Sequence, residues 1–247
     1  MALGFIPTGI SGLDELLDNK GIPSGHTVLL SGGPGSGKTT LAIQFLFQGA
    51  TQYNESGLYI SLDEDPADIK RNMLNFGWDL AKLEDEIRLM FINVSPIRSS
   101  GSVRPGLMQL GMKEFKLVNL LEAINEGIKE IQASRVVIDP ITKFMLQYPD
   151  EEEQIHAMRD LIAELGKTSC THLLVSELRG TGVEREYQFE EYLSQGVILL
   201  RTHQREDKIV RIVQVEKMRG TNMDPQPRPY DITSEGIVIF PDLPVFR

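Results

Sequence analysis

The sequence has little of several residue types, and each shortage argues against a class of protein. Its 247 residues include one cysteine, Cys170, so no internal disulfide can form, and the surrounding TSCTHLLVSE predicts a buried, unreactive thiol. No apolar run approaches the roughly 18 residues of a membrane-spanning helix. The first residues lack a basic segment followed by an apolar one, so we expect no secretory signal. These absences favour a cytoplasmic protein without a membrane partner.

Positive charge is also scarce. Twenty-five lysines and arginines face 35 aspartates and glutamates, for a net charge of −10. This argues against a high-affinity, nonspecific coat for nucleic acid, because such binding depends on neutralising phosphates. A local basic patch is still possible, because lysines and arginines cluster in two segments of the sequence. These are Arg98, Arg104, Lys113 and Lys116, and then Arg201, Arg205, Lys208, Arg211, Lys217 and Arg219.

The hydrophobic pattern predicts an α/β fold in one domain, residues 1–247. Six short apolar or β-branched runs are typical of strands buried on both faces of a parallel sheet; they are 27–31, 57–62, 88–94, 135–139, 172–177 and 196–201. Helical spacing recurs between them, at 38–52, 66–75, 117–132 and 152–167. Alternation of this kind predicts a mainly parallel, twisted sheet with helices on both faces. Residues 208–218 and 229–240 instead predict a C-terminal antiparallel extension.

Residues 32–39, GGPGSGKT, match the phosphate-binding pattern G-x-x-x-x-G-K-[ST] without a mismatch. Main-chain N–H groups must curl around a phosphate here, and side chains would obstruct the backbone angles that this requires. The helix that follows directs its N-terminal N–H groups at the same anion. Lys38 would hold the β- and γ-phosphates, and the Thr39 hydroxyl would bind Mg²⁺. The predicted ATP·Mg²⁺ cradle is Gly33, Pro34, Gly35, Ser36, Gly37, Lys38 and Thr39.

Residues 32–39 thus form a predicted P-loop, and two signatures that often accompany a P-loop are missing from the sequence. No N-K-x-D follows it, so a guanine-specific switch protein is disfavoured. No S-G-G-Q-type signature occurs downstream, so a transporter-type ATPase is disfavoured too.

Acidic residues follow two of the predicted strands. Asp139 ends RVVID and would hold Mg²⁺ or help to orient the attacking water. Asp63 and Glu64 follow GLYISL, and either could act as general base towards that water. Asp65 precedes Pro66 and is expected to cap a helix.

Three blocks resemble the KaiC-like branch of the RecA superfamily, the single-domain "circadian clock protein-like" ATPases. The long opening block, TGISGLDELLDNKGIPSGHTVLLSGGPGSGKTTLAIQFLFQGA, resembles that family's opening, and FGWDL and KMRGTNM resemble later family blocks. The resemblance covers nearly the whole chain and implies a RecA-like P-loop NTPase. It places Lys38, Thr39 and Thr40 on ATP·Mg²⁺ and makes Asp139 the metal-side aspartate.

The resemblance also bears on the rate of hydrolysis. The family usually has two adjacent glutamates where this chain has Asp63 and Glu64. The shorter carboxylate implies slow hydrolysis, or a transfer of the catalytic role to Glu64, because catalytic geometry is sensitive to shifts of one bond length. A polar position near Ser176 is also implied at the end of the next strand.

The family's K-x-R-G block corresponds here to Lys217 and Arg219, and the resemblance implies that they act on the γ-phosphate of a neighbouring subunit. It therefore implies a homo-oligomer, with a hexameric ring as in KaiC-like proteins or a filament as in recombinases.

The sequence leaves two alternatives to a slow ATPase. One is a recombination or repair accessory that binds single-stranded DNA through segments 98–116 and 179–188, where Arg98, Arg104, Lys113, Arg179 and Arg185 could touch phosphates. Four glutamates at 184, 186, 190 and 191 weaken that alternative. The other is a non-hydrolysing ATP sensor that docks a signalling partner of unknown identity.

Overall fold

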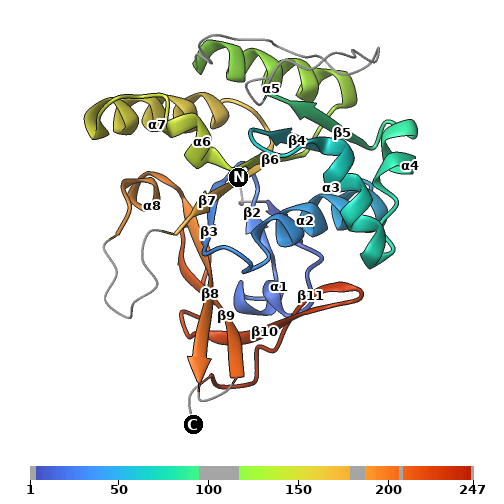
Figure 1. Ribbon diagram of the computed structural model, residues 1–247, viewed down its shortest axis with the longest axis vertical. Helices are drawn as coiled ribbons and strands as arrows, with labels where there is room; N and C mark the ends of the chain where they lie inside the picture. Colours follow the sequence, from blue (N-terminus) through green and yellow to red (C-terminus); the bar gives the residue numbers. More distant parts are fainter. Residues whose placement is uncertain (1–3, 95–116, 179–186, 206–207, 246–247) are drawn as a thin grey trace.

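The computed structural model describes residues 4–94, 117–178, 187–205 and 208–245. A nine-stranded sheet dominates them, with strand order β11-β10-β9-β8-β3-β7-β6-β4-β5 (Figure 1). The strands from β8 to β5 are parallel. Their bounds are Thr27–Gly32 (β3), Gly57–Ser61 (β4), Leu89–Asn93 (β5), Arg135–Asp139 (β6), Thr171–Glu177 (β7) and Gly196–Arg205 (β8).

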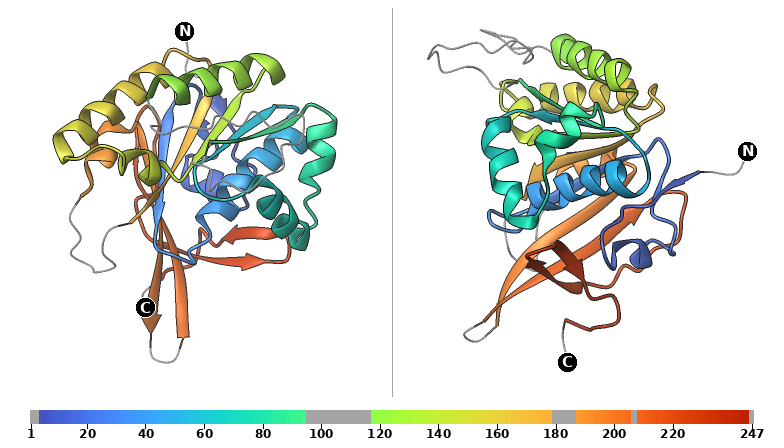
Figure 2. Two further views of the ribbon diagram at one scale, coloured as in Figure 1. Left: turned by 45° about the horizontal axis from the view of Figure 1, so that its top comes forward. Right: turned by 90° about the vertical axis from the view of Figure 1, so that its right-hand side faces the viewer.

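The remaining strands extend this sheet in antiparallel fashion. They are β9 (Lys208–Met218), β10 (Arg228–Thr233) and β11 (Gly236–Ile239). β8 and β9 form a two-stranded ribbon that projects past the rest of the sheet (Figures 1 and 2). A separate short pair joins β1 (Phe5–Ile6) to β2 (Ile22–Pro23).

Helices cover both faces of the sheet. One core contains residues of α1 (Leu13–Leu16), α2 (Lys38–Gln52), α3 (Pro66–Met73) and α4 (Leu80–Asp85). The other contains residues of α5 (Leu117–Ile131), α6 (Ile141–Met145) and α7 (Glu151–Leu165). Figure 2 shows α5 and α7 on one side of the sheet and α2 on the other. The last two helical elements are η1 (Leu74–Phe76) and α8 (Phe189–Leu193).

The structure confirms the α/β fold, the mainly parallel sheet and the antiparallel extension. The predicted helix 38–52 and strand 208–218 have the observed bounds. β8 runs four residues further than the predicted 196–201, because it pairs with β9 along the ribbon. The short helices α1, α4, α6 and α8 were not predicted, since four to six residues give too little helical period to recognise.

Two expectations about single features can be compared directly with the structure. The prediction that Cys170 is buried is confirmed, and burial raises the pKa of its thiol. No helix within the described ranges is long and apolar enough to cross a lipid bilayer.

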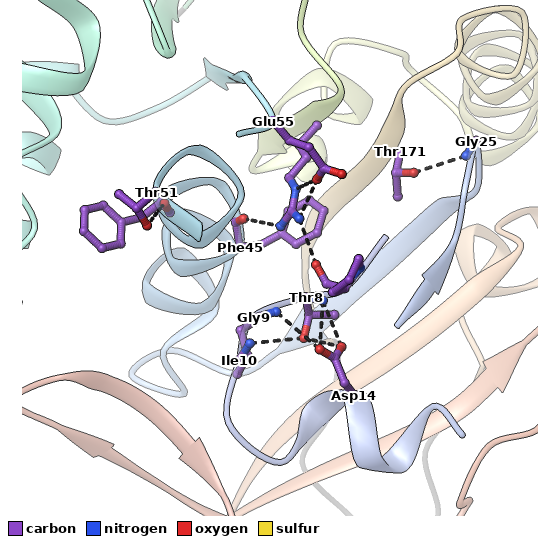
Figure 3. Close-up of polar contacts among 12 residues, drawn as sticks. Thr8, Gly9, Ile10, Asp14, Gly25, Phe45, Thr51, Glu55 and Thr171 are labelled. Atoms are coloured by element: carbon purple, nitrogen blue, oxygen red, sulfur yellow. Dashed lines mark hydrogen bonds and ion pairs between the residues drawn. The ribbon is translucent and has the colours of Figure 1, made fainter. Parts of the chain in front are cut away.

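A buried arginine ties together the elements that carry the candidate site. Arg135, at the start of β6, has a fully buried side chain. Its guanidinium donates to the Glu55 carboxylate at 2.7 Å, to the Phe45 carbonyl on α2 at 2.7 Å and to the Pro7 carbonyl at 2.8 Å (Figure 3). Gly49 leaves room for it, since a Cβ there would lie 2.4 Å from the arginine Nε. Arg135 thereby fixes α2 against β6. Lys38 lies at the first residue of α2, and Asp139 lies at the last residue of β6.

The opening block folds around its own acidic residue. Asp14 of α1 accepts hydrogen bonds from the Thr8 amide at 2.8 Å and from the Thr8 hydroxyl at 2.6 Å (Figure 3). Gly12 adopts a positive φ of 81°, and a Cβ there would lie 2.2 Å from the Ile239 carbonyl oxygen of β11. The block therefore packs its turn directly against the C-terminal extension.

Candidate functional site

The P-loop joins the end of β3 to the start of α2. Gly35 and Gly37 adopt positive φ angles of 72° and 84°, which side chains rarely tolerate. Cβ atoms placed on Gly33 and Gly35 would project into open space with nothing within 4 Å. The main chain thus presents a bare concave surface, which fits a phosphate approaching the N-terminus of α2.

The loop is held from both sides by its own chain. The Lys38 ammonium donates to the carbonyl oxygens of Gly32 at 2.9 Å and Gly33 at 3.0 Å. From the other side, the Tyr230 hydroxyl of β10 donates to the Ser36 carbonyl. Ile232 of β10 lies where a Cβ on Gly37 would project. The C-terminal extension is therefore part of the wall that shapes the loop.

A cavity of about 310 Å³ opens where the P-loop meets the carboxyl ends of β4, β6 and β7. This is the edge at which α/β sheets bind ligands. The lining residues are Gly35, Gly37, Lys38, Thr39, Thr40, Tyr59, Ser61, Asp63, Glu64, Asp139, Pro140 and Glu177. Of the predicted cradle, Gly33, Pro34 and Ser36 belong to the same loop without lining the cavity, and the Ser36 hydroxyl turns back to the Gly33 carbonyl at 2.8 Å.

Thr39 and Asp139 meet in this cavity although 100 residues separate them. The Thr39 hydroxyl donates to Asp139 Oδ2 at 2.8 Å, and the Tyr59 hydroxyl donates to the same oxygen at 2.8 Å. Burial raises the pKa of Asp139, while the two hydrogen bonds and Lys38 oppose that rise. A hydroxyl beside a carboxylate is an oxygen donor set that fits Mg²⁺.

Asp63 and Glu64 both line the cavity but have different surroundings. Asp63 lies 3.2 Å from the ammonium of Lys143 on α6 in a half-exposed ion pair. Burial raises the pKa of Glu64, and the negative charges of Asp139, Asp63 and Asp68 raise it further. Lys38 has a lowered pKa, chiefly because it is buried. The cavity therefore gathers acidic side chains around one lysine, an arrangement that favours a bound cation.

Lys217 and Arg219 lie at the opposite edge of the sheet from this cavity. The Arg219 amide donates to the Gln195 carbonyl at 2.9 Å, and the Arg219 carbonyl lies 2.9 Å from His26 Nε2. These residues adjoin the start of β3, whereas the P-loop follows its end. At about 3.3 Å per residue, the length of β3 separates the two edges by roughly 16 Å.

The two cations of this segment also differ from each other. The Lys217 ammonium donates to three carbonyl oxygens at the end of α8, those of Glu191 at 2.8 Å, Tyr192 at 3.1 Å and Ser194 at 2.5 Å. An ammonium has three donors, so in this conformation Lys217 caps α8. The Arg219 side chain is exposed, and its guanidinium makes no ion pair with the residues that the structure describes.

Several residues in or beside the cavity were missed from the sequence, among them Tyr59, Lys143 and Glu177. Tyr59 lies in the apolar run of a buried strand, and no local sequence pattern indicates that its hydroxyl has a polar partner. Lys143 lies in a helix too short to recognise. Glu177 could have been found, because it ends the buried run HLLVSE as Asp139 ends RVVID. It lines the cavity, whereas the Ser176 side chain is buried beside Ser31 in the sheet.

The segments predicted to contact DNA lie almost wholly outside the described residues. This applies to 98–116 and to 179–186, and hence to Arg98, Arg104, Lys113, Arg179 and Arg185. Binding of single-stranded DNA stays a prediction.

The chain is similar to known proteins over nearly its whole length. A family model described as "ATPase: KaiC" matches residues 6–244. The chain belongs to the KaiC family of ATPases. The predicted resemblance and the RecA-like fold class are thereby confirmed.

Relatives of two lengths share this KaiC-family domain. The circadian clock oscillator protein KaiC of Synechococcus elongatus is 34% identical over 97% of this chain, which spans 45% of that protein. A UPF0273 protein of Methanocaldococcus jannaschii is 33% identical, with 96% of each chain covered. The crystal structure of a KaiC-like protein from Pyrococcus horikoshii superposes with a TM-score of 0.82 at 33% identity, covering 97% of this chain and all of that one. The chain thus spans about half of the clock protein and nearly all of its archaeal relatives.

Proposed function

We propose that this chain is a single-domain ATPase that binds ATP·Mg²⁺ and hydrolyses it slowly as a homo-oligomer. The observation that carries the proposal is the cavity in which the P-loop residues Lys38 and Thr39 meet Asp139. Membership of an ATPase family supports the nucleotide, and the oxygen donors beside the phosphate cradle support the metal.

Each lining side chain has a role that follows from its position. The P-loop amides and Lys38 hold the phosphates, and Lys38 exchanges its contacts with the Gly32 and Gly33 carbonyls for phosphate oxygens. Thr40, next in α2, adds a hydroxyl beside them. Thr39 and Asp139 would hold Mg²⁺, which when bound offsets the negative charge of the triphosphate. Glu64 or Asp63 accepts a proton from the attacking water.

The distance between Arg219 and the chain's own P-loop supports a homo-oligomer, given the role that the family resemblance implies for Arg219. A guanidinium at the strand-start edge cannot reach a phosphate held roughly 16 Å away at the other edge. A head-to-tail neighbour can bring the two edges together, and such contacts close into rings or continue as filaments. We extend the family resemblance to a hexameric ring in which Arg219 meets the neighbour's γ-phosphate. Lys217 would join it only by giving up its contacts with α8.

Native mass spectrometry with and without ATP and Mg²⁺, paired with a phosphate-release assay, tests the proposal. We expect one nucleotide per subunit, a larger assembly when nucleotide is bound, and slow release of phosphate. ATP bound without phosphate release would favour the alternative of a non-hydrolysing sensor. Failure to bind ATP would refute the whole proposal, and turnover by monomers would refute its oligomeric part.

Paired variants can decide which carboxylate is the base. Glu64→Gln should slow phosphate release by about 100-fold or more, as expected for loss of a general base. Asp63→Asn should cost less than about tenfold, because Asp63 is shorter and already pairs with Lys143. Single-turnover rates at saturating ATP measure both, with ATP affinity as the control. The reverse ranking would assign the proton transfer to Asp63.

A further inference from the structure

A tyrosine outside any nucleotide-binding motif lies behind the metal-side aspartate. Tyr59 is in β4, and its side chain is 1% exposed. Its hydroxyl donates to Asp139 Oδ2 at 2.8 Å, and its ring packs against Phe91 of β5 with 5.3 Å between centroids. A buried phenol needs a hydrogen-bond partner, and Asp139 is the one it has among the described residues.

Two donors therefore share one oxygen of the Asp139 carboxylate. Thr39 approaches Oδ2 from the P-loop side and Tyr59 from β4. Rotating the carboxylate would break both hydrogen bonds in a setting where Asp139 is only 7% exposed. Within the described part of the chain no group donates to Oδ1, and Asp139 lines the cavity. The second oxygen is thus left for a ligand.

One oxygen of the Asp139 carboxylate therefore fixes its orientation, and the other is available to bind a ligand. A carboxylate that must bind a metal ion gains affinity when a second group holds it in the binding orientation, and loss of that group typically costs about 10- to 100-fold. A phenylalanine at position 59 would fill the same space against Phe91. The hydroxyl is therefore the feature that packing alone does not require.

We propose that Tyr59 is a positioning residue that orients Asp139 and thereby sets the affinity of the site for the Mg²⁺ that accompanies ATP. The inference rests on the proposed ATP·Mg²⁺ site and adds a residue that no motif marks. Tyr59 lines the cavity, but its hydroxyl is hydrogen-bonded to Asp139, so we expect its effect to appear in metal binding.

Tyr59→Phe tests this role, because it removes one hydroxyl and keeps the ring. Calorimetric titration with ATP is carried out in EDTA and again over a range of Mg²⁺ concentrations. In EDTA the variant should bind ATP within about twofold of the wild type. The Mg²⁺ concentration that gives half of the metal-dependent gain in affinity should rise about tenfold. At saturating Mg²⁺, phosphate release should return to within about twofold of the wild-type rate.

Two reference variants accompany it. Tyr148→Phe removes the hydroxyl of a tyrosine that packs against Phe144 and does not line the cavity, and it should leave the Mg²⁺ curve unchanged. Asp139→Asn should remove most of the metal-dependent gain. In that background, Tyr59→Phe should change the Mg²⁺ curve no further, since the two residues act as one unit.

The possible results separate this inference from the proposed function. An unchanged Mg²⁺ curve for Tyr59→Phe, in a protein whose wild type responds to Mg²⁺, overturns the role of Tyr59 alone. If Tyr59→Phe loses as much ATP affinity in EDTA as it does with Mg²⁺, the role is overturned too, because Tyr59 would then support the pocket rather than the metal. A wild type whose ATP binding ignores Mg²⁺ would overturn the metal site of the proposed function itself.

Discussion

Lys38→Ala is expected to remove ATP binding and phosphate release together. Among the described residues that line the cavity, Lys38 is the one cation beside four acids, Asp63, Glu64, Asp139 and Glu177. Without it, a triphosphate with its Mg²⁺ would lie beside those carboxylates with no cationic side chain from the cavity lining to hold it. Truncating one partner of a buried charge pair costs about 2–5 kcal/mol, which is roughly 30- to 4,000-fold in affinity. Titration with ATP in the presence of Mg²⁺ measures this loss.

The control must separate lost binding from a collapsed loop, because Lys38 also holds the Gly32 and Gly33 carbonyls. Thermal unfolding without nucleotide should therefore be compared for Lys38→Ala and wild type, and the two should agree within a few degrees. Lys20→Ala removes a surface lysine that pairs with Asp18 and should bind ATP normally. Near-normal ATP affinity in a folded Lys38→Ala protein would contradict the assignment of this loop as the phosphate cradle.

Arg219→Ala is expected to retain ATP binding and assembly while phosphate release falls by about 1,000-fold, the lower range for loss of an arginine finger. The side chain is exposed at the strand-start edge and contributes nothing to its own cavity. Single-turnover assays on the assembled protein measure the rate. Arg71→Ala, which removes an exposed arginine paired with Asp68 on α3, is the matched control and should keep the wild-type rate.

Mixing the two variants tests whether the arginine acts between subunits. Lys38→Ala supplies an intact arginine, and Arg219→Ala supplies an intact P-loop. Co-assembled in equal amounts, they should recover about a quarter of wild-type turnover, since about one head-to-tail interface in four combines both intact parts. No recovery in verified mixed assemblies would contradict action between subunits.

The sequence by itself determined those parts of the site that depend on local backbone chemistry. GGPGSGKT predicts a phosphate cradle, and the backbone is consistent with it, because Gly35 and Gly37 adopt positive φ and Cβ atoms on Gly33 and Gly35 would project into open space. RVVID specifies an acid at the end of a buried strand, and parallel strands bring such ends to the edge where the P-loop lies. The apolar runs that predict the strands and helices also depend on the local sequence alone. The fold class and the position of Asp139 at the end of a buried strand could therefore both be predicted.

Only the tertiary structure decided which side chains meet across elements. Tyr59 reaches Asp139 over 80 residues, Lys143 pairs with Asp63, and Lys217 caps α8. Each contact depends on strand register and on how a helix packs against the sheet, and a change of one residue in register would turn the side chain to the other face. The edge on which Arg219 lies has the same origin, because the antiparallel pairing of β9 with β8 brings its end back to the start of β3.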